Sequence, residues 1–253
     1  MTDTYGQSIY AYEGYASKTV KWVPADTEDR FKDHMSRPDK RKILFDNLWN
    51  SRTINYTFNK DGFRSEEFID SINDSIVFLG CSLTMGIGMA LEDSWTYKVA
   101  RSFKLRRYNL GIGGGSADTC FRLAHHWVPI LKPKYVVMLI PPPGRFEVLK
   151  SNGISQYSVQ STESHIVNFI QEWISSSANT KLNYTKNILA ISAICKDLNI
   201  PFFVKDIRDT GNEFVDPNNE WARDLMHPGI QWNESVSASF IGEIKQWEEQ
   251  QHI

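Results

Sequence analysis

Ser82 is the residue whose surroundings most favour nucleophilic chemistry. It follows an apolar, β-branched run at residues 75–80, and further glycines stand at positions 86 and 88. A short apolar run bounded by turn residues predicts a buried strand. A serine directly after such a strand lies at the carboxyl edge of a sheet, where open α/β sheets keep their ligand crevices. Ser82 is therefore a candidate nucleophile, and it requires a base and oxyanion donors from elsewhere in the chain.

His227 and Asp224 are the candidates for the base and for the acid that orients it. Pro228 disfavours the helical conformation for His227, so we expect this histidine on a loop before a final helix at about 233–249. Asp224 lies three residues earlier, and one turn would bring its carboxylate to the imidazole and fix the tautomer. Seen alone, such a pair is more often a capping Asp beside a surface His.

The glycine cluster at residues 111–116 has two interpretations. Gly114 follows a predicted strand and opens a predicted helix, so its amide could point into the crevice as the amide of Ser82 would. The alternative is a dinucleotide fingerprint, because the cluster nearly matches G-x-G-x-x-G. That motif needs an acidic residue ~20 positions later. Residues 126–144 contain no Asp or Glu, so the nucleotide interpretation is disfavoured.

Three blocks together resemble the SGNH, or GDSL-like, hydrolase superfamily. They are Gly80–Thr84 (G-C-S-L-T), Asn109–Gly114 (N-L-G-I-G-G) and Asp224–Pro228 (D-L-M-H-P). The blocks occur in the family's order, and the resemblance covers roughly residues 72–250. It implies an α/β fold of three layers, α/β/α, with a central, mostly parallel, flavodoxin-like sheet. It also implies serine hydrolysis of esters, thioesters or acetylated sugars.

The resemblance implies a role for each matched residue. Ser82 would be the nucleophile and an oxyanion donor, and Gly114 would be the second oxyanion donor. His227 would be the base of a Ser-His-Asp triad, and Asp224 would orient it. No metal or other cofactor is implied.

Two positions depart from the family pattern. Cys81 stands where the family usually has Asp before the serine, and its thiol is an alternative nucleophile. The family's third block, G-x-N-D, is replaced after the strand at 135–140 by residues 141–145 (P-P-P-G-R), without Asn or Asp. Losing one oxyanion donor typically costs ~10²–10³ in rate. Arg145 could replace the missing Asn or bind an acidic group of the substrate; alternatively it caps a loop. Glu147, close to Arg145 in sequence, is expected to be its ion-pair partner rather than a second catalytic acid.

The expected elements alternate in the second part of the chain. The predicted strands lie at 75–80, 107–111, 135–140 and 201–205, and the predicted helices at 91–100, 116–131, 162–176, 180–198 and 233–249. Near-continuous apolar strands alternating with helices predict a parallel sheet covered on both faces. Before the sheet, residues 1 to about 40 are expected to be irregular and 53–58 to form a flanking strand, while 209–220 should be rich in turns. We expect an N-terminal extension, 1–71, that packs on a main domain, 72–253.

Composition narrows the classes of partner. The 253 residues carry a formal net charge of −2, which argues against a nucleic-acid partner. The three cysteines, at positions 81, 120 and 195, are too widely spaced for a zinc motif or a disulfide framework. No apolar run reaches the ~20 residues of a membrane span. The amino terminus lacks a signal-peptide pattern, so we expect a cytoplasmic protein, although a processed chain would look the same.

The favoured function is a serine esterase that removes an acyl group, such as O-acetyl, from a carbohydrate or another small molecule. The expected partner is that ester, with no nucleic acid and no membrane. One alternative is an O-acyltransferase on the same scaffold, which would need a second pocket for the acceptor. The other is a non-catalytic binding module, motivated by the missing third-block Asn.

Overall fold

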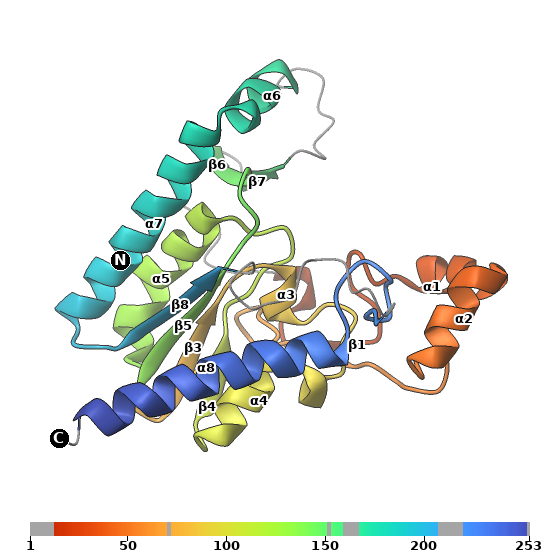
Figure 1. Cartoon of the computed structure of the whole chain (residues 1–253), viewed down its shortest axis with the longest axis horizontal. Helices are drawn as coiled ribbons and strands as arrows, with labels where there is room; N and C mark the ends of the chain where they lie inside the picture. Colours follow the sequence, from red (N-terminus) through yellow and green to blue (C-terminus); the bar gives the residue numbers. More distant parts are fainter. Residues whose placement is uncertain (1–12, 70–71, 151–152, 159–166, 207–219, 252–253) are drawn as a thin grey trace.

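A four-stranded parallel sheet forms the centre of the molecule (Figure 1). The computed structural model describes residues 13–69, 72–150, 153–158, 167–206 and 220–251. The strand order is β4-β3-β5-β8, and all three neighbouring pairs are parallel. The strands are β3 (Ser75–Leu79), β4 (Arg106–Asn109), β5 (Tyr135–Ile140) and β8 (Phe202–Asp206). This order matches the first four strands of a flavodoxin-like sheet.

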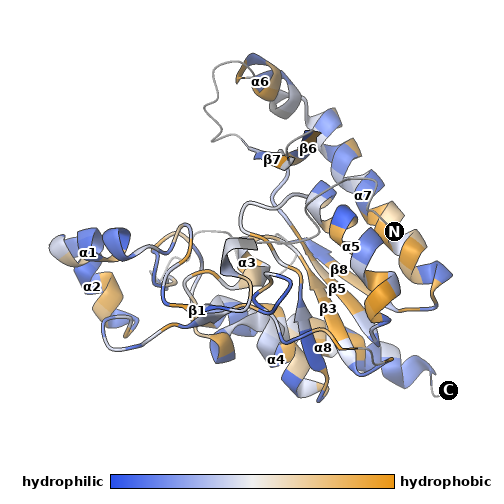
Figure 2. Cartoon of the chain, turned by 180° about the vertical axis from the view of Figure 1, so that it is seen from behind, coloured by the Kyte–Doolittle hydropathy of each residue, from blue (hydrophilic) through white to orange (hydrophobic). Residues whose placement is uncertain are grey.

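Helices cover both faces of the sheet (Figure 1). Val77 and Leu79 of β3 pack with α5 (Ala117–Leu131) and α7 (Ser177–Asp197) on one face. Ile76 and Phe78 pack with α4 (Trp95–Ser102) and α8 (Ile230–Gln251) on the other face, because successive side chains of a strand point to opposite faces. Figure 2 shows the apolar colour gathered on these strands. The expected three-layer α/β/α fold is therefore confirmed.

The residues before the sheet form helices and a buried cluster. α1 (Glu28–Ser36) begins after Thr27, whose hydroxyl accepts a hydrogen bond from Arg30 N at 3.2 Å. α2 (Pro38–Asp46) begins with the proline that suits a first helical position. The expectation of irregular structure up to about residue 40 is therefore wrong from residue 28 onward. Two short helices with few apolar residues gave no clear period in the sequence. A small sheet of β1 (Thr19–Val20) and β2 (Tyr56–Thr57) replaces the longer flanking strand.

Apolar side chains from this region pack against two loops at the carboxyl edge of the main sheet. The cluster joins the N-terminal region to the chain after β3 and to the chain before α8, although these segments are far apart in the sequence. Its buried members are Val23, Leu44, Trp49, Ile54, Tyr56, Phe58, Met85, Ile87, Met89 and Ala222. The N-terminal region is thus part of the packed molecule.

The outer edge of β4 is covered by side chains. Ser65 Oγ donates to Arg107 O at 3.0 Å and accepts from Asn109 N at 3.0 Å. Glu66 Oε1 accepts from Arg107 N at 3.2 Å. These two residues occupy backbone groups that a further strand would otherwise bind.

A hairpin and a helix project beyond the carboxyl edge of the sheet (Figure 1). β6 (Phe146–Lys150) pairs antiparallel with β7 (Gly153–Tyr157), and α6 (Val167–Ser175) packs its Ile170 against Phe146 and Tyr157. The start of the helix predicted at 162–176 and nearly all of the turn-rich stretch predicted at 209–220 lie outside the described residues. Within the described ranges, none of the helices has both the length and the apolar character needed to cross a membrane.

Candidate active site

Ser82 begins α3 (Ser82–Met85), a single helical turn directly after β3. Gly80 makes this sharp turn possible, because a Cβ there would lie 2.0 Å from Thr84 Oγ1 and 2.9 Å from Leu139 O. The side chain of Ser82 is almost completely buried, and its one polar contact among the described residues is with Cys81 Sγ at 4.0 Å. Cys81 is only 2% exposed and belongs to an apolar cluster, which favours a packing role for its thiol.

The second sequence block is bound to the Ser82 turn. Asn109 Nδ2 donates to Thr84 O at 2.8 Å, and Asn109 Oδ1 accepts from Gly111 N at 2.9 Å. Ile112 N donates to Gly80 O at 3.3 Å, so the two blocks run beside each other at the sheet edge.

The two candidate oxyanion donors are the backbone amides of Ser82 and Gly114. Within the described part of the chain, neither Ser82 N nor Gly114 N donates a hydrogen bond to another residue. Gly114 is exposed, whereas Ser82 is buried. Unpaired N–H groups close to a nucleophile are the groups that can stabilise an oxyanion.

His227 and Asp224 form the expected pair. Asp224 Oδ2 lies 2.5 Å from His227 Nδ1, and Asp224 Oδ1 accepts from the backbone amides of Met226 and His227 at 3.1 and 3.2 Å. The Asp224 side chain is fully buried, and that of His227 is 12% exposed. An Nδ1–H donated to the carboxylate leaves Nε2 as an acceptor, which is the tautomer that a general base requires.

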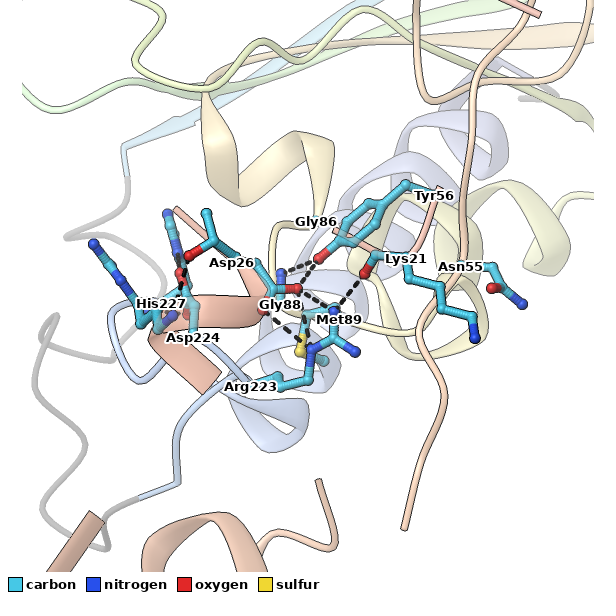
Figure 3. Close-up of polar contacts among 12 residues, drawn as sticks. Lys21, Asp26, Asn55, Tyr56, Gly86, Gly88, Met89, Arg223, Asp224 and His227 are labelled. Atoms are coloured by element: carbon cyan, nitrogen blue, oxygen red, sulfur yellow. Dashed lines mark hydrogen bonds and ion pairs between the residues drawn. The ribbon is translucent and has the colours of Figure 1, made fainter. Parts of the chain in front are cut away.

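The loop that carries His227 rests on the chain that follows Ser82. Arg223 N donates to Gly88 O at 3.0 Å. Gly88 has φ +75°, and a Cβ there would lie 2.8 Å from Ala222 Cβ and 3.1 Å from Asp224 Oδ1. Figure 3 shows Gly88, Asp224 and His227 in this arrangement. The described residues contain no hydrogen bond between Ser82 and His227. Such bonds are often long in ligand-free enzymes and tighten when substrate binds.

Glu147 has a different partner from the one expected. Its carboxylate accepts from Arg122 Nε and from Thr119 Oγ1, each at 2.7 Å. The predicted ion pair between Glu147 and Arg145 is therefore wrong, because α5 presents a closer cation and a hydroxyl to β6. Arg145 Nη1 is buried without a hydrogen-bond partner among the described residues.

Gln156 is a site residue that sequence reasoning missed. Its Oε1 lies 3.0 Å from the position that a Cβ on Gly114 would occupy, so this side chain of β7 lies beside the residue of the second candidate oxyanion donor. The only signal in the sequence was Asn152-Gly153 between two short runs, a pattern typical of hairpins. The hairpin thus contributes one side chain next to Gly114.

The fold and these contacts define an open α/β protein with a serine and a His–Asp pair at the carboxyl edge of its sheet. A scan against protein-family models and a search of curated proteins found no match. Among solved structures, the chain is similar to a psychrotrophic esterase from Pseudoalteromonas sp., with 14% identity, 70% of this chain and 100% of that chain covered, and a TM-score of 0.39.

Two further solved structures are similar at the same level. One is an acetyl xylan esterase from the rumen bacterium Butyrivibrio proteoclasticus, with 12% identity, 72% of this chain and 66% of that chain covered, and a TM-score of 0.40. The other is an SGNH-hydrolase family esterase, with 13% identity, 68% of this chain and 72% of that chain covered, and a TM-score of 0.36. At identities and TM-scores this low, the fold and the candidate site rest on the geometry described above.

Proposed function

We propose that the chain is a serine esterase that hydrolyses an acyl ester, such as an O-acetyl group, of a carbohydrate or another small molecule. The observation that carries this proposal is the 2.5 Å contact between His227 Nδ1 and Asp224 Oδ2, on a loop bound to the chain that follows Ser82. A buried carboxylate that fixes an imidazole beside a serine turn is the arrangement that serine hydrolysis uses.

In the proposed reaction, Ser82 Oγ attacks the carbonyl carbon of the ester while His227 Nε2 accepts the hydroxyl proton. The amides of Ser82 and Gly114 donate to the oxyanion of the tetrahedral intermediate. The intermediate collapses to an acyl-serine, and His227 returns its proton to the departing alkoxide. A water molecule then attacks the acyl-serine, with His227 as base, and releases the carboxylic acid. Asp224 orients the imidazole throughout and stabilises its protonated form.

Arg145 is the proposed contact for an acidic group of the substrate. The support for this role is its buried Nη1, which has no partner among the described residues. A guanidinium in such surroundings gains from a carboxylate or another anion that can accept two parallel hydrogen bonds. The same guanidinium is the proposed replacement for the missing third-block Asn.

The test is hydrolysis of p-nitrophenyl acetate together with labelling by a fluorophosphonate. Ser82→Ala should lower kcat by about 10⁴-fold or more and abolish labelling. Ser237→Ala, at a buried serine of α8, is the matched control, and Cys81→Ala tests the alternative nucleophile. Wild-type rates in Ser82→Ala would contradict the proposal, and so would a wild-type protein that neither hydrolyses nor labels. Release of free acetate would indicate hydrolysis, whereas formation of an acylated acceptor would indicate transfer.

A further inference from the structure

A buried ion pair links the N-terminal region to the loop of His227. Asp26 is 1% exposed, and both of its oxygens bind the guanidinium of Arg223, with Nε to Oδ1 at 3.1 Å and Nη2 to Oδ2 at 2.7 Å. Arg223 Nη2 also donates to Lys21 O at 2.8 Å, and its guanidinium lies 4.0 Å from the ring centroid of Trp22. Three residues of the N-terminal region thus hold the residue next to Asp224.

Tyr56 extends this ion pair to the chain after Ser82. Its hydroxyl donates to Asp26 Oδ2 and accepts from Gly88 N at 2.8 Å. Burial raises the pKa of Tyr56, so the hydroxyl keeps its proton and remains a donor. Because Arg223 N donates to Gly88 O at 3.0 Å, the contacts form a closed ring through Arg223, Asp26, Tyr56 and Gly88 (Figure 3).

Arg64 also binds the chain after Ser82, at residues 86–89. Its Nη1 donates to Gly86 O at 2.5 Å, and its Nη2 donates to Met89 O at 2.9 Å. The guanidinium also lies 4.3 Å from the ring centroid of Tyr56. Burial lowers the pKa of Arg64. A rigid, planar fork of donors suits two carbonyls in a fixed geometry, so Arg64 defines the conformation of residues 86–89.

We propose that Asp26, Tyr56 and Arg64 are positioning residues for the candidate active site. They fix the chain after Ser82 against the loop of Asp224 and His227, and they thereby set the place of the base relative to the nucleophile. This inference rests on the proposed function. Buried ion pairs often add little net stability compared with apolar side chains, but their directional contacts fix one arrangement.

The experiment compares Tyr56→Phe with Tyr108→Phe. Both substitutions remove a hydroxyl that accepts a backbone N–H, from Gly88 at 2.8 Å in the first case and from Ile69 at 3.2 Å in the second. Tyr108 lies in the core cluster between the sheet and α5, so its substitution is a matched control. Tyr56→Phe should lower kcat for p-nitrophenyl acetate by about 10- to 100-fold with little change in KM, because misplaced catalytic groups cost rate more than binding. Tyr108→Phe should keep the wild-type kcat.

Hydrogen–deuterium exchange supplies a measurement that does not depend on activity. In Tyr56→Phe, the amides of Gly88, Arg223 and His227 should exchange faster than in wild type, and in Tyr108→Phe they should not. Asp26→Asn should have the same effect, and Asp26→Glu should restore part of the protection. Equal exchange and equal kcat in Tyr56→Phe and Tyr108→Phe would overturn the inference. If the wild-type protein hydrolyses no ester, the proposed function fails, and the exchange rates still decide whether these residues position the two loops.

Discussion

At the scale of single residues, the candidate site combines contacts between residues close in sequence, such as Asp224 and His227, with contacts between distant ones, such as Arg223 and Gly88. Ser82, Asp224 and His227 could be predicted because each stands beside a local signal, such as a glycine turn or a following proline. Gln156, Asp26 and Arg64 could not, because their contacts join residues that are tens or hundreds of positions apart. Sequence patterns carry little information about such long-range pairs.

Asp224→Asn tests the orienting role of the carboxylate. The amide has nearly the same shape, but it can present an N–H to His227 Nδ1 and so favour the wrong tautomer. We expect kcat for p-nitrophenyl acetate to fall by about 10³- to 10⁴-fold, with the unfolding midpoint changed little by comparison. The check is steady-state kinetics beside thermal unfolding of the same preparation. An unchanged kcat in a folded variant would exclude Asp224 from the proposed mechanism.

At the scale of elements, the strands of the main sheet were predictable to within about two residues, because burial on both faces gives near-continuous apolar runs. The hairpin β6–β7 and the helix α1 were missed. Both are only partly covered, and their mixed polar composition leaves neither a two-residue nor a 3.6-residue period that stands out. The predicted pairing of Glu147 with Arg145 failed for a related reason, since the hairpin turns that carboxylate toward α5.

Gly88→Ala tests the contact between the two loops of the site. At φ +75°, and with Ala222 Cβ 2.8 Å from the new methyl group, alanine can fit only if the loops separate. We expect a loss of about 1–3 kcal/mol in the free energy of unfolding, together with a lower kcat. Urea unfolding and ester hydrolysis measure the two effects.

Gly242→Ala is the control for this substitution. Gly242 lies in α8, and none of the described residues comes within 4 Å of a Cβ there, so alanine should leave kcat unchanged and raise stability by about 0.5–1 kcal/mol. Equal stability and kcat in both variants would mean that the loops tolerate separation.

At the scale of the whole molecule, the N-terminal region and the α/β/α layers form one packed body through the cluster of Val23, Tyr56, Met85 and Ala222. The sequence indicated that the extension packs on the main domain, but not that it contacts both loops of the candidate site. The polar composition of the N-terminal region does not reveal this role, because only a few of its side chains are buried and make these contacts.

His34 makes the stability of the folded protein depend on pH. It is buried in α1, and its burial, followed by the charge of Lys40, lowers its pKa. The unfolded chain, with a histidine pKa near 6.5, therefore binds more protons than the folded chain, and stability falls as the pH drops below about 6.5. When the pH is lowered from about 7.5 to about 5, the urea unfolding midpoint should fall less in His34→Gln than in wild type. His125→Gln, at an exposed position, should behave as wild type does; an equal fall in all three proteins would exclude His34 as a source of acid sensitivity.

Ser65 has a consequence for how copies of this protein behave at high concentration. Its hydroxyl occupies Arg107 O and Asn109 N on the outer edge of β4, where the backbone would otherwise be available to a strand of a second molecule. This hydroxyl, together with the Glu66 carboxylate on Arg107 N, therefore disfavours edge-to-edge self-association. Ser65 thus ends the sheet at β4 and disfavours its continuation into a second molecule.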